Sequence, residues 1–167
     1  MVEVTVRSAT ADDSKAIAAC LHRNYFDQGG VDELPAALLK RRTLDAFEAR
    51  AASRAATGDA VVAVEGGRVV GFAVAKRDAN EVEQVFVDGA VRGTGVAARL
   101  LSAAEARLAG GRMHLVATPK NARAIRFYEK AGWTRVGLVV YDAEVGDGDG
   151  TTCAVDLVRF EKARECG

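Results

Sequence analysis

A glycine-rich segment, residues 91–98, contains the residue types that most directly suggest chemistry. It stands between a predicted strand and a predicted helix, where unpaired backbone N–H groups and the helix dipole favour a bound phosphate. Gly93 and Gly95 would let the backbone approach such an anion closely. The same glycines would also suit a tight strand-to-helix turn, so the surrounding residues must decide between the two interpretations.

Two nucleotide-binding motifs fit this loop poorly. The dinucleotide-binding motif needs an acidic residue about 20 positions further on, where it holds a ribose hydroxyl. Residues 114–119 contain no carboxylate. The phosphate loop of nucleoside triphosphatases ends in Gly-Lys-Ser/Thr, which contacts phosphate and magnesium, and this loop lacks that ending. Both interpretations are therefore disfavoured.

The elements around the loop predict a mixed α/β sheet with helices on its faces. Apolar and polar residues alternate over 2–7 as in a half-buried strand, and Thr10 with Asp13 offers a capping box for the first helix. The glycines at 66–67 between two apolar runs predict a hairpin. The predicted helices are 11–25, 34–56 as one long or two short helices, 95–108 and 119–130, and the predicted strands are 2–7, 60–64, 69–75, 82–87, 113–117, 133–141 and 151–160.

Three segments carry a more specific signal. Residues 83–87, Glu-Gln-Val-Phe-Val, form the strand before the loop, and the loop itself contains Arg92-x-x-Gly95-x-Ala97. Residues 121–133 read Asn-Ala-Arg-Ala-Ile-Arg-Phe-Tyr-Glu-Lys-Ala-Gly-Trp. In this order they resemble the strand, the pyrophosphate loop and the Asn-x-x-Ala-x-x-Phe-Tyr-x-x-x-Gly-aromatic segment of the GNAT superfamily of acetyl-CoA-dependent N-acetyltransferases.

The resemblance is strongest over residues 60–142, and it departs from the family pattern at Gly89, where the family often has proline. It implies one GNAT-like domain over residues 1–167, of the α/β (α+β) class. The implied fold is a mixed, mostly antiparallel sheet of about six or seven strands with about four flanking helices and a V-shaped cofactor cleft between the fourth and fifth strands. The implied reaction moves an acetyl group from acetyl-CoA, the acyl donor, to a primary amine without a metal.

The resemblance places most of the cofactor contacts on the strand and the loop. Backbone groups of Phe86 and Val87 would meet the pantetheine arm, and a main-chain N–H near them would polarise the thioester carbonyl. The pyrophosphate would rest on the main chain of the loop. The loop residues implied are Arg92, Gly93, Thr94, Gly95, Val96 and Ala97.

The later predicted helix, 119–130, carries further implied site residues. Asn121 is expected to be a helix N-cap, a contact to the cofactor arm, or both. Tyr128 occupies the family position of the general acid that protonates the departing thiolate, and its alternative is a tyrosine that packs beside Phe127 with its hydroxyl satisfied locally. Arg126 and Lys130, one turn apart, are candidates for the 3′-phosphate.

Glu81 and Glu83 are the candidates for the general base that takes a proton from the acceptor ammonium. Strict alternation along the strand places both on one face with Val85 and Val87, leading to the thioester carbonyl. Glu83 ranks above Glu81 because it lies nearer along the strand to the expected acetyl group. An ordinary solvated strand face is the alternative, and an amine of low pKa would need no enzyme base.

Other reactive residue types have simpler structural interpretations. Cys153 in the predicted last strand is expected to be a small core residue, and His114 is expected to be structural. Asp147 and Asp149, in a Gly-Asp-Gly-Asp-Gly segment, are expected to form a turn. Because that turn joins the last two strands, attraction of a cationic acceptor by these carboxylates is a further hypothesis.

Composition and charge exclude several classes of protein. The 167 residues, 49% hydrophobic and 28% charged, fit one compact globular domain. Lys+Arg and Asp+Glu both number 23, and this zero net charge disfavours a nucleic-acid partner. No apolar run approaches the ~18 residues of a membrane-spanning helix, and the three cysteines lack metal-site spacing. We therefore expect a reduced, metal-free cytoplasmic protein without a membrane partner.

The identity of the acceptor stays open at this stage, because specificity resides in loops without a general code. A small-molecule amine is the leading interpretation. A protein N-terminus or lysine, and a non-catalytic acyl-CoA-binding regulatory module, are the alternatives, while the zero net charge disfavours a transferase that acts on charged tRNA. The sequence does not decide whether the protein is a homodimer.

Overall fold

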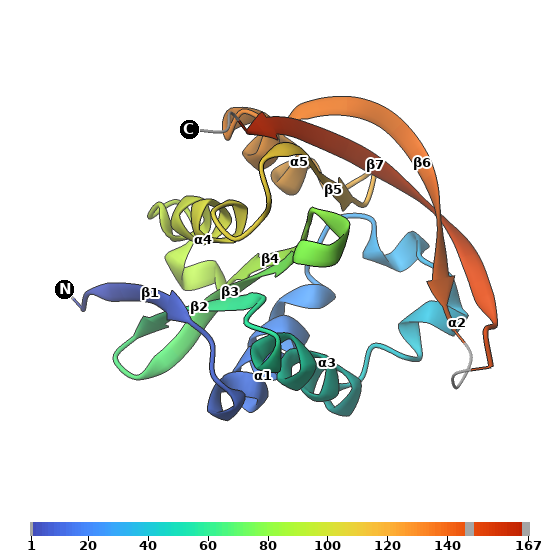
Figure 1. Cartoon of the computed structure of the whole chain (residues 1–167). Coiled ribbons are helices and arrows are strands. Elements are labelled where there is room, and N and C mark those ends of the chain that lie inside the picture. Colours follow the sequence, from blue (N-terminus) through green and yellow to red (C-terminus); the bar gives the residue numbers. More distant parts are fainter. Residues whose placement is uncertain (1, 146–148, 165–167) are drawn as a thin grey trace.

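The computed structural model describes residues 2–145 and 149–164 of the chain. Within these residues the centre of the fold is a seven-stranded sheet with the order β1-β2-β3-β4-β5-β7-β6 (Figure 1). The strands are β1 Val4–Ser8, β2 Ala60–Glu65, β3 Arg68–Lys76, β4 Glu81–Val87, β5 Gly111–Ala117, β6 Thr134–Glu144 and β7 Thr152–Arg164. Among these strands β4 and β5 form the one parallel pair, so the mostly antiparallel sheet is confirmed.

Helices cover both faces of the sheet (Figure 1). They are α1 Ser14–Tyr25, α2 Ala36–Leu39, α3 Leu44–Ala56, α4 Val96–Glu105 and α5 Ala122–Lys130. Ile17 and Leu21 of α1 and Phe47 of α3 are buried in a core cluster on one face of the sheet. Leu100 and Leu101 of α4 are buried in the cluster on the opposite face. In the described part of the chain, no helix combines the length and apolar character needed to cross a membrane.

The structure adds detail to two of the predicted helices. The predicted first helix begins with a 3₁₀ turn, Ala11–Asp13, and its capping box is confirmed by the Asp13 carboxylate, which accepts from the Thr10 N–H at 2.8 Å. The 34–56 segment forms two helices, because Thr43 starts α3 by accepting from the Ala46 N–H at 3.2 Å. The described residues therefore contain five α-helices where about four were implied.

The strands β4 and β5 separate soon after they meet. Among the described residues they share a single register pair, Glu81 with His114. Beyond this pair one edge of β4 is left without a neighbouring strand, because β3 pairs only with its other edge. The predicted V-shaped cleft between the fourth and fifth strands is therefore confirmed.

A register shift interrupts β4 near its start. Val74 of β3 pairs with Gln84, but the next residue, Ala75, pairs with Val82. Glu83 is therefore an extra residue without a partner on β3, which is a β-bulge. Bulges turn side chains away from strict alternation and are frequent next to functional sites.

The bulge changes which face the β4 side chains occupy. Val82 belongs to the same core cluster as Val85 and Val87, while Glu83 bonds to α3 on the other side of the sheet. The predicted grouping of Glu81 and Glu83 with Val85 and Val87 on one face is therefore wrong. Strict alternation fails here because one extra residue shifts the period of the strand.

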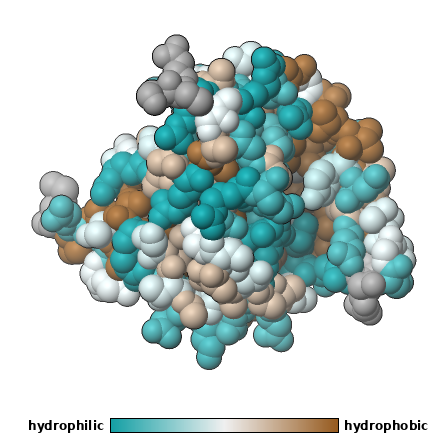
Figure 2. All heavy atoms as spheres, in the orientation of Figure 1, coloured by the Kyte–Doolittle hydropathy of each residue, from teal (hydrophilic) through white to brown (hydrophobic). Residues whose placement is uncertain are grey.

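β6 is one of the two outer strands of the sheet, and it exposes apolar side chains. Val136, Leu138 and Val140 are each more than half exposed. Figure 2 shows hydrophobic residues gathered over this edge, at the upper right of the view. The sequence left the question of a homodimer open, and this edge is where the sheet has both unpaired backbone and exposed apolar surface.

Candidate active site

A cavity of about 620 Å³ occupies the cleft in which β4 and β5 separate. Strand β4 contributes Glu81 and residues 83–87 to its lining, and β5 contributes residues 116–117. Its other walls come from α1, α5, the glycine loop, residues between Leu34 and Arg50, and the strands β6 and β7. The cavity thus brings together the glycine loop, the carboxylates of β4 and the side of α5 that carries Tyr128.

The glycine loop presents unpaired backbone N–H groups at one end of the cavity. Gly93 and Gly95 have φ values of +78° and +89°, which glycine adopts without strain. Among the described residues, the N–H groups of Gly93 and of residues 95–97 donate to no backbone carbonyl. The Val96 side chain is buried, so this residue can meet a ligand through its main chain, whereas the Thr94 N–H and hydroxyl both donate to the Val91 carbonyl. This arrangement suits a phosphate group.

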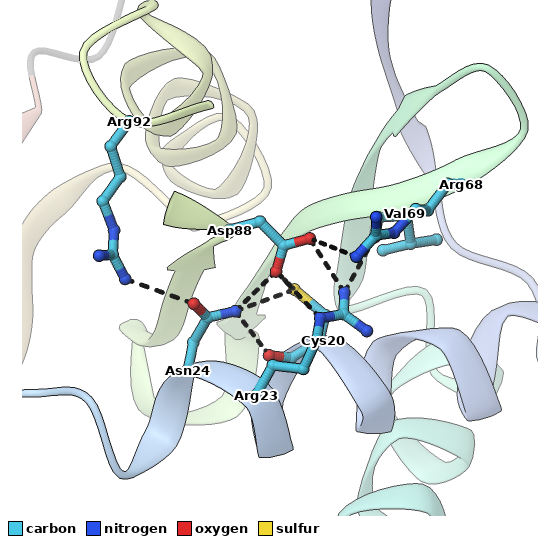
Figure 3. A network of polar contacts seen from close by, with 7 residues as sticks. All are labelled: Cys20, Arg23, Asn24, Arg68, Val69, Asp88 and Arg92. Carbon is cyan, nitrogen blue, oxygen red and sulfur yellow. Dashed lines mark hydrogen bonds and ion pairs between the residues drawn. The ribbon is translucent and has the colours of Figure 1, made fainter. Parts of the chain in front are cut away.

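A polar network ties the loop to α1 (Figure 3). The Arg92 guanidinium donates to the Asn24 side-chain oxygen at 3.3 Å and to Asp27 at 3.2 Å. The Asn24 amide donates in turn to Asp88 at 2.8 Å and to the Cys20 carbonyl at 2.8 Å. Arg92 is therefore held at the wall of the cavity by the end of α1.

Asp88, which directly follows β4, is the centre of this network (Figure 3). Arg23 donates to its two oxygens at 3.2 and 3.0 Å, and Arg68 lies 3.5 Å away. Burial raises the pKa of Asp88, but hydrogen bonds from Arg23 and Asn24 and the charges of Arg23 and Arg68 outweigh this effect and hold the pKa below its ordinary value. The ionised carboxylate thus connects α1, β3 and the start of the glycine loop.

Phe86 and Val87 occupy the last two positions of β4 and line the cavity. On one edge they pair with Phe72 and Gly71 of β3. Their other edge faces the cleft, because β5 pairs with β4 only at Glu81 among the described residues. Main-chain groups at the end of β4 are therefore available to a ligand.

Asn121 and Tyr128 stand on the cavity side of α5. Asn121 is confirmed as the N-cap, since its side-chain oxygen accepts from the Ala124 N–H at 3.2 Å. Tyr128 is buried between Phe127 and Phe160, and none of the described residues hydrogen-bonds to its hydroxyl. Burial raises the pKa of Tyr128 to about 12, so the phenol stays protonated in the physiological range.

Arg126 and Lys130 do not line the cavity. Both are exposed on the outer side of α5, whereas Arg123 on the same helix contributes to the cavity wall. The helical spacing correctly placed the two predicted residues one turn apart, but it did not show which side of α5 faces the cleft. Their contact with a 3′-phosphate stays a prediction.

Glu83 is the most strongly paired carboxylate of the site. Arg54 donates to its two oxygens at 2.9 and 2.8 Å, and Arg50 donates to one of them at 2.6 Å. Burial raises the pKa of Glu83, but the hydrogen bonds and charges of Arg54 and Arg50 outweigh it and lower the pKa below its ordinary value. Glu83 is therefore a weakly basic carboxylate at the place where a stronger base was expected.

The surroundings of Glu81 disfavour its charged form, whereas those of Glu83 favour it. Burial and, to a smaller extent, the charge of Glu83 raise its pKa above the ordinary value. The His114 imidazole lies beside it, with Nε2 3.8 Å from a Glu81 oxygen. Burial and the charge of Arg159 lower the pKa of His114, so the imidazole is neutral near pH 7. Glu81 is therefore the more basic carboxylate in the cavity.

Sequence reasoning missed the cationic wall of the cavity, which consists of Arg41, Arg42 and Arg50. The only feature of the sequence that could have indicated this wall was the arginine-rich composition of the 34–56 segment. Spacing within that segment did not reveal that α3 packs its arginines against β4. The contact between Arg54 and Glu83 joins residues 29 positions apart and depends on the packing of the helix on the sheet.

Cys153 and Asp149 have the structural roles that we expected from the sequence. Cys153 packs against a small apolar cluster with Ala143 and Val155. The Asp149 carboxylate accepts from the Thr151 N–H at 2.9 Å, which confirms it as a turn former. Asp147 and Cys166 lie outside the described residues. Over residues 2–145 and 149–164, no group of three or more His, Cys, Asp and Glu side chains is placed to hold a metal ion.

Comparison with known proteins bears directly on this site. The model of a family described as the acetyltransferase (GNAT) family matches residues 21–133, which is more than half of the chain and includes the loop, β4 and α5. No curated protein matches the sequence.

Several solved structures share the fold. The putative acetyltransferase yncA from Salmonella typhimurium, solved with acetyl-CoA, is 24% identical with a TM-score of 0.69, covering 99% of this chain and 96% of that one. The PaiA N-acetyltransferase from Thermoplasma acidophilum, solved with coenzyme A, is 15% identical with a TM-score of 0.65 over 96% and 99% of the two chains. A GCN5-related N-acetyltransferase from Rhodopseudomonas palustris is 19% identical with a TM-score of 0.69 over 98% of each chain.

The family match and the fold lead to the same conclusion. The matched residues include the glycine loop with its unpaired N–H groups and the cleft beside the open edge of β4. The structural neighbours cover nearly the whole chain. The chain therefore belongs to the GNAT family of acetyltransferases.

Proposed function

We propose that this acetyltransferase binds acetyl-CoA in the cleft between β4 and β5 and transfers the acetyl group to a primary amine of a small molecule. One observation carries the proposal: a single cavity joins the unpaired N–H groups of Gly93 and Ala97 to a protonated tyrosine and a basic carboxylate. The loop suits the pyrophosphate, and the other two groups suit acid and base catalysis of acyl transfer.

The residues of the cleft fit the donor along its length. The loop N–H groups and Arg92 hold the pyrophosphate, and the open edge of β4 at Phe86 and Val87 holds the pantetheine arm. The Asn121 side chain contacts the arm from the start of α5 while it also caps the helix. The donor supplies the acetyl thioester.

The catalytic steps then follow from the groups nearest to the thioester. Glu81 accepts a proton from the acceptor ammonium, directly or through a water, and the neutral nitrogen forms a bond to the carbonyl carbon. Main-chain N–H groups near Phe86 hold the carbonyl oxygen while negative charge develops on it. The bond between carbon and sulfur breaks, and Tyr128 gives its proton to the departing thiolate. The nitrogen loses its second proton, directly or through water, to the tyrosinate, which restores Tyr128. The products are the N-acetylated amine and the free thiol.

Glu81 fits the role of base better than Glu83. The best general base has a pKa near the working pH, and burial moves the pKa of Glu81 in that direction. Both oxygens of Glu83 already accept hydrogen bonds from arginines, which moves its pKa the other way. We therefore assign Glu83 the role of anchoring Arg50 and Arg54 beside the cavity.

A small acceptor is favoured by the walls at the far end of the cavity. Leu38 from α2 lines one side, and Tyr141 and Leu157 from β6 and β7 line another. A cavity enclosed by several elements suits a small molecule better than a flat protein surface would.

The decisive experiment is isothermal titration of the purified protein with acetyl-CoA and with CoA, followed by thiol release across a panel of amines. We expect binding in the range of about 1 μM to 1 mM and thiol release that depends on the amine. Binding without release for any amine would support the regulatory-module alternative instead. The absence of binding would overturn the proposed function.

A further inference from the structure

The cationic wall of the cavity has charge that the proposed reaction does not use. Arg42 and Arg50 both line the cavity, and Arg54 reaches Glu83 from the same helix as Arg50. Arg50 and Arg54 bring two positive charges to the single negative charge of Glu83, and Arg42 adds a further positive charge to the cavity lining. Acetyl transfer to a simple amine would gain nothing from this excess, since positive charge repels an ammonium.

Arg42 is the clearest case, because no carboxylate of the described residues pairs with it. Among the described residues, no Asp or Glu oxygen lies within 4.0 Å of its guanidinium, although the side chain is only partly exposed. Its Nε donates to the Tyr25 hydroxyl at 3.1 Å, and its Cζ lies 5.6 Å from the centre of the Tyr25 ring. Tyr25 thus holds the arginine in place and leaves its two terminal nitrogens for another acceptor.

Arg42 is connected through Tyr25 to β4, the strand beside which we place the thioester. The Tyr25 ring stacks against Phe86 of β4, with 6.5 Å between the ring centres. One aromatic ring therefore separates Arg42 from the strand that we assign to the thioester. Arg50 lies close to β4 as well, because it bonds to Glu83 at 2.6 Å and acts on the charge of Glu81.

We propose that the acceptor is a small primary amine that also carries a carboxylate, as amino acids do, and that Arg42 and Arg50 bind this carboxylate. This inference rests on the proposed function and names the class of its acceptor. The ammonium of the acceptor would lie toward Glu81 and its carboxylate toward the arginines. A planar guanidinium binds a carboxylate through two parallel hydrogen bonds, which gives both affinity and orientation.

The charges in the cavity agree with a zwitterion better than with a polyamine. Glu83 is already neutralised by two arginines, and Glu144, the other acidic residue of the lining, lies at the end of β6. Among the described residues, Glu81 is thus the one carboxylate near β4 left for an ammonium. A polyamine would place its second cation against the arginines, whereas an amino acid places an anion there.

The test compares L-amino acids with their own amides, which keep the amine and side chain but lack the anion. We expect kcat/KM for the preferred amino acid to exceed that for its amide by roughly 10- to 100-fold. The comparison is stringent, because a neighbouring carboxylate raises the pKa of the ammonium, so the amide offers more neutral amine at the same pH. Without carboxylate recognition the amide would therefore react faster.

Variants of Arg42 locate the recognition. Arg42→Gln should remove the preference for the amino acid over its amide, by raising KM for the amino acid about 10-fold or more, while the dissociation constant for acetyl-CoA stays unchanged. Arg42→Lys, which keeps the charge but not the planar geometry, should restore part of the preference. Arg135→Gln, which removes an exposed arginine on β6, is the matched control and should leave both constants unchanged.

Three results would contradict the inference while leaving acetyl transfer itself intact. These are equal or faster reaction of the amides, a preference for diamines, and failure of every amino acid to react or to bind to a protein that binds acetyl-CoA. A protein that does not bind acetyl-CoA would instead overturn the proposed function, and this inference with it.

Discussion

Glu81 and Glu83 differ in electrostatic surroundings although one residue separates them in the sequence. Two arginines stabilise the charge of Glu83, whereas burial and the neighbouring Glu83 destabilise the charge of Glu81. A pair of carboxylates with separated pKa values supports a division of roles, in which one accepts protons and the other stays ionised. The chemistry we propose depends on this division.

The first prediction concerns that division. Glu81→Gln should lower kcat/KM by about 10²-fold or more. It should also remove the acidic limb of the pH profile, which is the fall in kcat/KM at low pH that protonation of the base causes. In the wild type this limb should lie above the pH expected for an ordinary glutamate, because burial raises the pKa of Glu81 and activity needs the ionised form. The measurement is kcat/KM against pH at saturating acetyl-CoA.

Glu83→Gln is the matched control for this prediction. It should keep the acidic limb but weaken the hold on Arg50 and Arg54, and so raise KM for the acceptor. If the limb disappeared in Glu83→Gln and persisted in Glu81→Gln, the assignment of the base would have to be reversed.

The second prediction concerns the acid. Tyr128→Phe keeps the ring between Phe127 and Phe160 and removes only the hydroxyl. We expect kcat to fall by about 10²-fold or more, because the thiolate would then leave without its proton donor. Binding of acetyl-CoA, measured by titration, should change little and would show that the fold is intact. An unchanged kcat would assign Tyr128 a packing role alone.

At the scale of elements, the site depends on how β4 begins and ends. The bulge at Glu83 turns its carboxylate toward α3, and the early separation from β5 opens the edge of β4. After Asp88, the left-handed glycines direct the chain into α4 with its first N–H groups unpaired. Strand, loop and helix therefore act together as one binding element.

The third prediction tests the glycine loop with a matched pair of variants. Gly95 and Gly67 have φ values of +89° and +80°, and no atom lies within 4 Å of a Cβ built at either position. Alanine at either site should therefore cost a similar amount of stability, about 1–2 kcal/mol from the left-handed conformation. Only Gly95→Ala should weaken acetyl-CoA binding, because Gly67 lies in the hairpin between β2 and β3.

Titration calorimetry and thermal unfolding of the two variants separate these effects. Equal loss of stability with a selective loss of acetyl-CoA affinity in Gly95→Ala is the expected outcome. Equal affinity in both variants would mean that the loop serves only as a turn.

At the scale of the whole molecule, a polar network joins elements from distant parts of the chain. Asp88 follows β4, Arg23 and Asn24 belong to α1, and Arg68 begins β3. Strands from both ends of the sequence also enter one sheet, and we infer from this that residues 1–167 act as one domain.

The fourth prediction follows from the lowered pKa of Asp88. A carboxylate whose folded pKa lies below its unfolded value of about 3.9 stabilises the folded state above that pH, and this stabilisation is lost as pH falls through the folded pKa. Asp88→Asn should therefore lower the free energy of unfolding by about 2 kcal/mol near pH 7. The difference between variant and wild type should shrink on acidification below pH ~4.

Urea unfolding at several pH values measures this difference. Asp12→Asn is the control and should show little effect. It changes an exposed aspartate in the 3₁₀ turn Ala11–Asp13, which precedes α1. A difference between Asp88→Asn and wild type that does not depend on pH would contradict the electrostatic explanation.

The sequence by itself determined the features that local residue types decide. Gly93 and Gly95 indicated a loop with left-handed conformations, and Asn121 indicated a helix cap, because each depends on the conformational preferences of a few neighbouring residues. The ordered motifs of the loop and of α5 identified the family. They also placed Tyr128 on the helix whose face lines the cavity.

Only the tertiary structure decided the electrostatics of the site. The bulge that turns Glu83 depends on the register between β3 and β4, and its two arginines come from a helix about 30 residues away. Arg42 reaches the cavity only because α1 presents Tyr25 beside Phe86. A charge is stabilised or destabilised by every group packed around it, and those groups are neighbours in space rather than in sequence.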